Sequence, residues 1–152
     1  MSRLIALSAM LGTLLAAAPA QAIVTPFGRE VHETIEEVLV YFRNQQGPNG
    51  AFGNPQANGL PILCFLEKRA SADFFAPSVG YEGMSDEDQG RIRNAVRYII
   101  DDNSDRAFSQ GVNPYSYGTG NKLMGLSLYK ATGGPDDVGA QVSVTQAIQN
   151  AV

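Results

Sequence analysis

Apolar residues recur along the chain at helical spacing, in two kinds of segment. In the first kind they form one stripe with charged residues on the opposite face, as from Val31 to Phe42. In the second kind nearly every position is apolar, as from Leu60 to Lys68. A stripe at spacings of three and four predicts an amphipathic helix, whereas a run without a polar face predicts a more buried one. The sequence therefore predicts an all-α fold.

Glycine, proline and serine mark where these helices begin and end. Gly47-Pro48 ends the first helix, and Pro61 can occupy the first turn of the second. Ser85 precedes three acidic residues, which predicts a capped helix that stops near Asp102. The remaining predicted elements are an irregular connection over 70–84, held by Phe74, Phe75 and Tyr81, a mostly apolar helix from Lys122 to Ala131, and an amphipathic stretch from Asp136 to the terminus.

The order of amphipathic helix, loop and apolar helix occurs twice, followed by the start of a third copy. Residues 92–96 recur as residues 148–152 at an offset of 56, and 35–41 match 92–98 at an offset of 57. Such repeats bury their apolar faces on their neighbours. We expect the amphipathic helices to form an outer layer that exposes Glu33, Glu37, Arg93 and Arg97. The inner layer would bury Leu63, Phe65, Leu66, Leu123, Leu126 and Leu128.

The amino-terminal residues have the three parts of a secretory signal peptide. Arg3 gives a positive start, residues 4–18 are apolar or small, and Ala20-Gln21-Ala22 fits a signal peptidase site. The apolar run is shorter than the ~20 residues that a membrane span requires. The sequence therefore predicts a signal peptide over 1–22, cleavage after Ala22, no membrane span in the mature chain, and a periplasmic or extracellular location.

Charge and rare residues narrow the chemistry. The net charge is −4 and no basic residues cluster, so nucleic acid is not an expected partner. Cys64 is the only cysteine and lies in an apolar run, which predicts a buried, inert thiol rather than a nucleophile. His32 is the only histidine, and a solvated or half-buried role is expected for it.

The loop after the first helix carries a recognisable motif. Gln46-Gly47-Pro48-Asn49-Gly50-Ala51-Phe52 has a Gln, a Gly and an aromatic residue at the spacing found in α/α-toroid proteins, the superfamily of terpenoid cyclases and protein prenyltransferases. The chain resembles the exported bacterial repeat proteins of that superfamily. The resemblance implies a partial α/α toroid in which Gln46, Gly50, Phe52 and, in the second unit, Phe108 are structural. The second unit departs from the motif, because Asp101 to Arg106 contain neither Gln nor Gly.

The third unit stops after its first helix has begun. We therefore expect residues 23–152 to form one α/α-hairpin repeat domain that is incomplete at its C-terminus. Two hairpins would leave apolar surface uncovered, so the mature chain alone is expected to aggregate, to self-associate through its last helix, or to be molten, unless further repeats complete it.

Two groups of polar residues are candidate sites. Asp101, Asp102 and Asp105 match the D-D-x-x-D pattern that binds magnesium in some terpene synthases, but their place at an outer turn favours solvated carboxylates. No metal or other cofactor is therefore expected. The loop into the fourth helix is the better candidate for a binding surface, through Tyr115, Tyr117, Thr119 and Asn121. Its tyrosines could instead pack the loops against each other.

These patterns favour an exported repeat protein with a binding or structural role in the cell envelope, whose ligand the sequence does not name. The alternative is an enzyme of the cyclase and prenyltransferase type whose catalytic residues lie outside this stretch. The acid motif, the zinc ligands and the thioester motif of that superfamily are absent here, and the apolar helices carry almost no polar residues. The sequence therefore favours a chain without enzymatic activity.

Overall fold

A computed structural model of the chain describes residues 22–102, 106–112 and 116–152. The elements in these ranges are α-helices and one 3₁₀ turn, with no strand among them, so the predicted all-α fold is confirmed. In chain order they are α1 (Pro26–Gln45), the 3₁₀ turn η1 (Pro55–Ala57), α2 (Gly59–Glu67), α3 (Asp86–Asp101), α4 (Ala107–Gln110), α5 (Ser116–Ala131) and α6 (Val144–Asn150).

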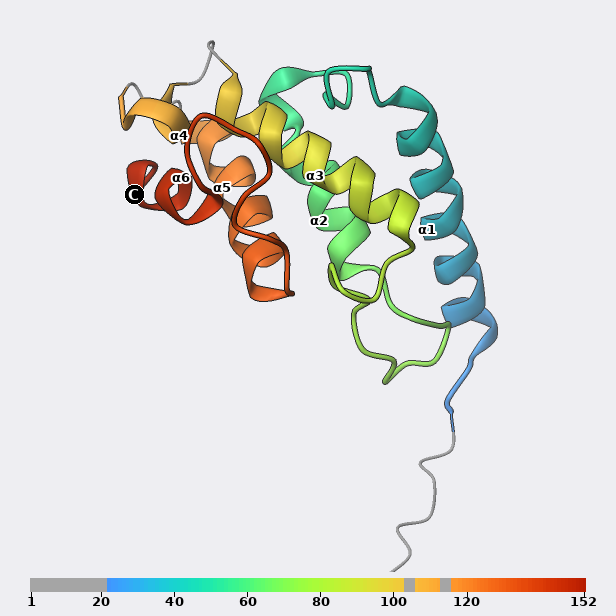
Figure 1. Cartoon of the computed structure of the whole chain (residues 1–152). Helices are drawn as coiled ribbons and strands as arrows, with labels where there is room; N and C mark the ends of the chain where they lie inside the picture. The colour runs from blue at the N-terminus through green and yellow to red at the C-terminus, as the bar shows by residue number, and fades with distance from the viewer. Residues whose placement is uncertain (1–21, 103–105, 113–115) are drawn as a thin grey trace, which may run out of the picture.

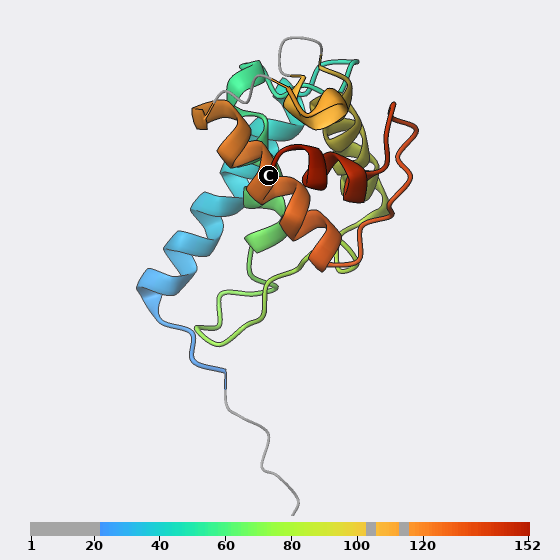
Figure 2. The same cartoon turned by 90° about the vertical axis from the view of Figure 1, so that its left-hand side faces the viewer.

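The two apolar helices, α2 and α5, form the most extensive helix pair and lie side by side. α1 lies at one end of the molecule against α2, whereas α6 lies at the other end against α4 and α5 (Figure 1, Figure 2). α3 runs across the middle and contacts α2, α4 and α6. Among the described helices, none combines the length and the apolar character needed to cross a bilayer.

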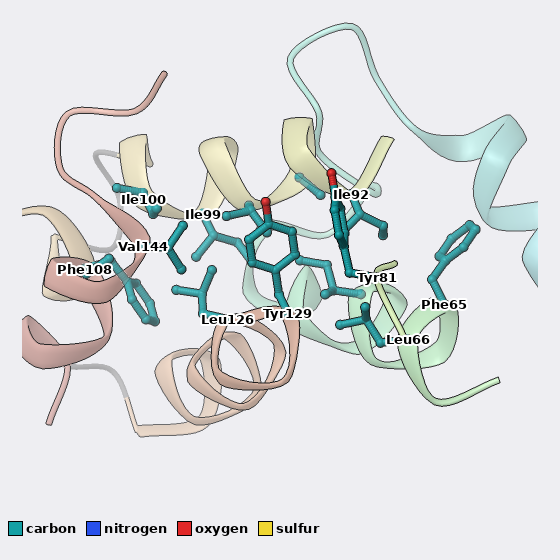
Figure 3. Close-up of a cluster of buried hydrophobic side chains, with 14 of the residues drawn as sticks. Phe65, Leu66, Tyr81, Ile92, Ile99, Ile100, Phe108, Leu126, Tyr129 and Val144 are labelled. Carbon is teal, nitrogen blue, oxygen red and sulfur yellow. The ribbon is translucent and has the colours of Figure 1, made fainter. Parts of the chain in front are cut away.

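The core is centred on α3. Its apolar stripe is completely buried and consists of Ile92, Ala95, Val96, Ile99 and Ile100. Leu66 from α2 and Leu126 from α5 belong to the same cluster (Figure 3). The rings of Tyr81 and Tyr129 pack edge to face beside them, with centroids 4.9 Å apart. α3 was predicted as part of an outer layer, yet it carries the centre of the core because three helices contact it.

The predicted difference in side-chain burial between the inner and the outer helices holds only in part. Phe65, Leu66 and Leu126 are buried and Glu33 and Glu37 are exposed, as expected. The other members of both sets, Leu63, Leu123, Leu128, Arg93 and Arg97, are half-buried. The two apolar helices thus each keep a side that no other described element covers.

The structure moves two predicted boundaries and adds two short elements. α6 begins at Val144, whereas the amphipathic stretch was predicted from Asp136. α5 begins at Ser116 rather than at the predicted Lys122, and η1 and α4 were not predicted. Gly118 and Thr119 have turn propensity but are buried where α5 packs. Burial against neighbouring elements overrides weak helix propensity there.

α1 is tied to α3 by a pair of charge-assisted hydrogen bonds. Arg43 Nε donates to Asp88 Oδ1 at 2.9 Å and Nη2 donates to Oδ2 at 2.7 Å. These bonds, more than the opposing effect of burial, hold the pKa of the Asp88 carboxyl below its usual value. Ser85 caps α3 by accepting a hydrogen bond from the Asp88 backbone N–H at 3.2 Å. The predicted helix start therefore also positions the ion pair.

We expect Asp88→Asn to reduce the free energy of unfolding at pH 7 by about 2 kcal/mol, because it removes a hydrogen-bonded charge. The folded pKa lies below the unfolded value, so this contribution is complete above about pH 4 and is lost as the pH falls through the folded pKa. Urea unfolding at pH 7 and pH 3 would show the difference between the wild type and Asp88→Asn shrinking at the lower pH. Asp86→Asn is the matched control, because Asp86 is an exposed residue of the same first turn, and an equal loss there would refute the ion pair's role.

Candidate binding groove along the first helix

One face of α1 remains open and borders a groove. Leu39 is the only residue of α1 that is buried. Two adjoining pockets, of about 340 and 300 Å³, follow this helix and share Ile35 and Glu67. α1 contributes five apolar side chains to them, Phe27, Val31, Ile35, Val38 and Leu39. We call this continuous hollow the α1 groove.

The opposite wall of the groove comes from the end of α2 and the segment that follows it. Cys64, Glu67 and Lys68 line one half, and residues 69–74 line most of the other. A short antiparallel pairing shapes this segment, in which Arg69 pairs with Ser78. The Arg69 guanidinium stacks on the Phe74 ring, 5.6 Å from its centroid. The wall thus combines apolar side chains, such as Phe74, with the charged side chains of Glu67, Lys68, Arg69 and Asp73.

The amino-terminal end of the described chain closes the groove. The Ile23 backbone N–H donates to Asp73 Oδ1 at 2.9 Å, and the Ile23 carbonyl accepts from the Phe74 N–H at 3.0 Å. Thr25 then caps α1 by accepting from the Gly28 N–H at 2.9 Å, and Pro26 fits the first helical position. Ile23 and Thr25 therefore form part of the groove.

The only histidine and the only cysteine of the chain both line this groove. His32 is half-buried, as expected, and its Nε2 lies 3.9 Å from Glu36 Oε1. Cys64 is exposed, so the prediction of a buried thiol is wrong: the residue lines the open groove between α2 and α1. Apolar neighbours still desolvate the sulfur and raise the pKa of the Cys64 thiol, with Glu67 adding to the effect. The thiol therefore stays protonated at neutral pH and is a poor nucleophile.

The residues predicted as a binding surface have mostly structural contacts. Asn121 accepts a hydrogen bond from the Gly59 N–H at 3.0 Å and donates to the Gln56 carbonyl at 2.9 Å, so it joins α5 to the start of α2. Tyr115 lies outside the described residues. Of the three described residues, Tyr117 is exposed, whereas Thr119 is buried and Asn121 bonds to the segment before α2.

The acidic turn after α3 is not the solvated cluster that was expected. Asp101 is half-buried, and its Oδ1 accepts a hydrogen bond from the Gln141 N–H at 2.9 Å. Asp102 pairs with Lys122, with Oδ2 and Nζ 3.6 Å apart and their side chains only 9% and 2% exposed. Asp105 is outside the described residues. In the part of the chain that the structure describes, no three His, Cys, Asp or Glu residues converge in a way that could hold a metal ion.

The residues of the repeat motif lie where α1, α2 and α3 meet. Gln46 Nε2 donates to the Gly50 carbonyl at 3.2 Å and to the Arg91 carbonyl in α3 at 2.9 Å. Gly50 has a φ of 93°, and a Cβ there would lie 2.4 Å from the Asn94 carbonyl oxygen. The Phe52 ring packs between Phe42 and Phe65. In the second unit, Phe108 is buried.

Sequence patterns did not reveal the α1 groove. Its α1 stripe was recognised, but was expected to face the core. Phe74 and Phe75 were expected to hold their segment in place, yet both are exposed, and only Tyr81 is buried. The sequence feature that could have indicated a binding surface there is the pair of adjacent aromatic residues in an otherwise mostly polar connection. No protein-family model, curated protein or solved structure matches the chain.

Proposed function

We propose that this protein is an exported helical-hairpin repeat protein of the α/α-toroid type with a binding role in the cell envelope. We further propose that the α1 groove is its binding site for an apolar, chain-like ligand such as an acyl chain. The observation that carries the proposal is the open apolar stripe of α1 opposite the segment 69–74. The volume of the larger pocket falls in the range of small-molecule sites, which are mostly apolar with a few polar groups at fixed positions.

Equivalent contacts in the two units support the repeat architecture. The first loop meets α3 at Asn94, where Gly50 approaches the carbonyl. In the second unit, the segment that contains α4 meets α6 at Asn150: its Nδ2 donates to the Phe108 carbonyl at 2.8 Å, and a Cβ at Gly111 would lie 3.4 Å from the Asn150 carbonyl oxygen. Asn94 and Asn150 occupy the same position of the sequence repeat. Each loop therefore packs on the following amphipathic helix, as a stacked array of hairpins requires.

The uncovered apolar surface bears on how the chain associates. Self-association was expected through the last helix, but α6 buries Val144 and Ala147 against α4 and α5. Apolar surface is uncovered at α1, where Phe27, Val31 and Val38 are exposed. An apolar surface of this kind is typical of a binding site, because soluble monomers cover most of theirs. This favours a ligand or partner at α1 over association through α6.

We expect a fluorescent fatty acid to bind the protein in a saturable, one-to-one manner, and Val31→Glu to weaken that binding at least about tenfold. The carboxylate introduced at position 31 would lose its water when the apolar ligand binds, and this desolvation costs free energy. Val40→Glu is the matched control, because Val40 is on the same helix, 51% exposed, and outside the groove, whereas Val31 is 39% exposed and lines it. Equal loss in both variants, or non-saturable binding, would refute the site.

A further inference from the structure

The contact between Ile23 and Asp73 has a chemical consequence if the leader is removed. We propose that Asp73 forms a binding site for the protein's own processed amino terminus, the α-ammonium group of Ile23, and that this pair closes the end of the α1 groove. The inference rests on the proposed export of the chain, since export supplies the cleavage after Ala22.

The position of the peptide bond suits processing. Residues 22–25 are exposed and precede α1, so an endopeptidase can reach the bond between Ala22 and Ile23. Hydrolysis adds one water molecule across this bond, leaving a carboxylate on Ala22 and an amine on Ile23. The new amine takes up a proton at neutral pH, because an α-amino group has a pKa near about 8. The neutral amide N–H that now faces Asp73 would thereby become a cation with three N–H donors.

The acceptor is already in place. Asp73 Oδ1 lies 2.9 Å from the Ile23 nitrogen and is oriented by a second donor, the Phe75 N–H at 3.2 Å. The Asp73 N–H in turn donates to Ser71 Oγ at 3.2 Å. Cleavage would thus convert a hydrogen bond between a neutral amide and a carboxylate into an ion pair between two opposite charges, without moving the carboxylate.

The pair also fixes two parts of the groove. Besides donating to Asp73, Ile23 accepts a hydrogen bond from the Phe74 N–H through its carbonyl, and Ile23 and Phe74 both line the larger pocket. The other charged or titratable side chains that line this pocket are His32, Glu67 and Arg69. Cleavage at a different bond would place the terminal amine elsewhere, and Asp73 would then face at most a neutral amide.

The test begins with the full chain expressed in an exporting bacterium. We expect N-terminal sequencing of the exported protein to give Ile-Val-Thr. An NMR titration of its α-amino nitrogen should then give a pKa raised by roughly 0.5 above the ordinary value, because a carboxylate faces the amine. Asp73→Asn should return the pKa to its ordinary value, and Asp73→Glu should restore part of the rise. One alanine inserted between Ala22 and Ile23, which keeps Asp73 but displaces the amine, should also abolish the rise.

The outcomes of this test distinguish the Ile23–Asp73 pair from the proposed export and the proposed ligand. An exported protein that begins at another residue overturns the inference along with the predicted cleavage site. A protein that begins with Ile23 but has the same α-amino pKa with and without Asp73 overturns the inference and leaves the proposed export standing. Fatty-acid binding by the α1 groove is measured separately, so its absence would contradict the proposed ligand and not the Ile23–Asp73 pair.

Discussion

Gly59→Ala is expected to be among the most damaging single substitutions in this protein, reducing the free energy of unfolding by about 3 kcal/mol. Gly59 begins α2 where it meets α5, and an added Cβ would lie 2.1 Å from the Asn121 carbonyl oxygen. The obstacle is backbone, so it can be relieved only by moving the two helices apart. Overpacking of this kind costs about 1–3 kcal/mol, and separation would also weaken the hydrogen bond from the Gly59 N–H to Asn121 Oδ1.

The matched control is Gly120→Ala in α5. A Cβ at Gly120 meets nothing within 4 Å, so this change keeps the packing of α5 on α2. Alanine in a helix is favoured over glycine by up to about 1 kcal/mol, and the variant should be neutral or more stable. Urea unfolding of both variants would measure the contrast. Similar stability of Gly59→Ala and the wild type would contradict the close helix approach.

Local signals predicted the helices that are determined by local interactions. Gly47-Pro48 and the Ser85 cap placed the end of the first helix and the start of the third within two residues of their observed positions. The start of α5 could not be read in this way, because the segment at 116–121 has the composition of a turn. Its helical state depends on Gly118 and Thr119 being buried by packing, which is information from another part of the chain.

The candidate site depends even more on distant contacts. The apolar run around Cys64 indicated burial, but Cys64 is exposed and lines the open groove between α2 and α1. The α1 groove exists because residues 69–74 return to the start of α1, where Asp73 accepts a hydrogen bond from Ile23, fifty residues earlier in the chain. Hydrophobic periodicity shows that α1 has an apolar face, but it does not show what covers that face.

Asp102→Asn is expected to reduce the free energy of unfolding by about 3 kcal/mol, although the sequence suggested a solvated residue. The Asp102 carboxylate lies 3.6 Å from Lys122 Nζ, and both side chains are shielded from water. Removing one charge of a buried ion pair costs about 3–5 kcal/mol, because the remaining charge stays desolvated. The substitution keeps the size of the side chain, so the loss reports on charge rather than on a cavity.

Three measurements would show whether the loss of stability comes from the buried ion pair and whether the acidic turn binds a metal ion. Asp101→Asn is the neighbouring control, and it should change stability by less than about 0.5 kcal/mol, because its amide oxygen can still accept from Gln141. The double variant Asp102→Leu with Lys122→Met should lose less than Asp102→Asn alone, since replacing both charges leaves neither one buried. Millimolar magnesium should leave the wild-type melting temperature unchanged, because an ion that does not bind the native state cannot stabilise it. A magnesium-dependent rise that disappeared in Asp102→Asn would instead show that the acidic turn binds a metal ion.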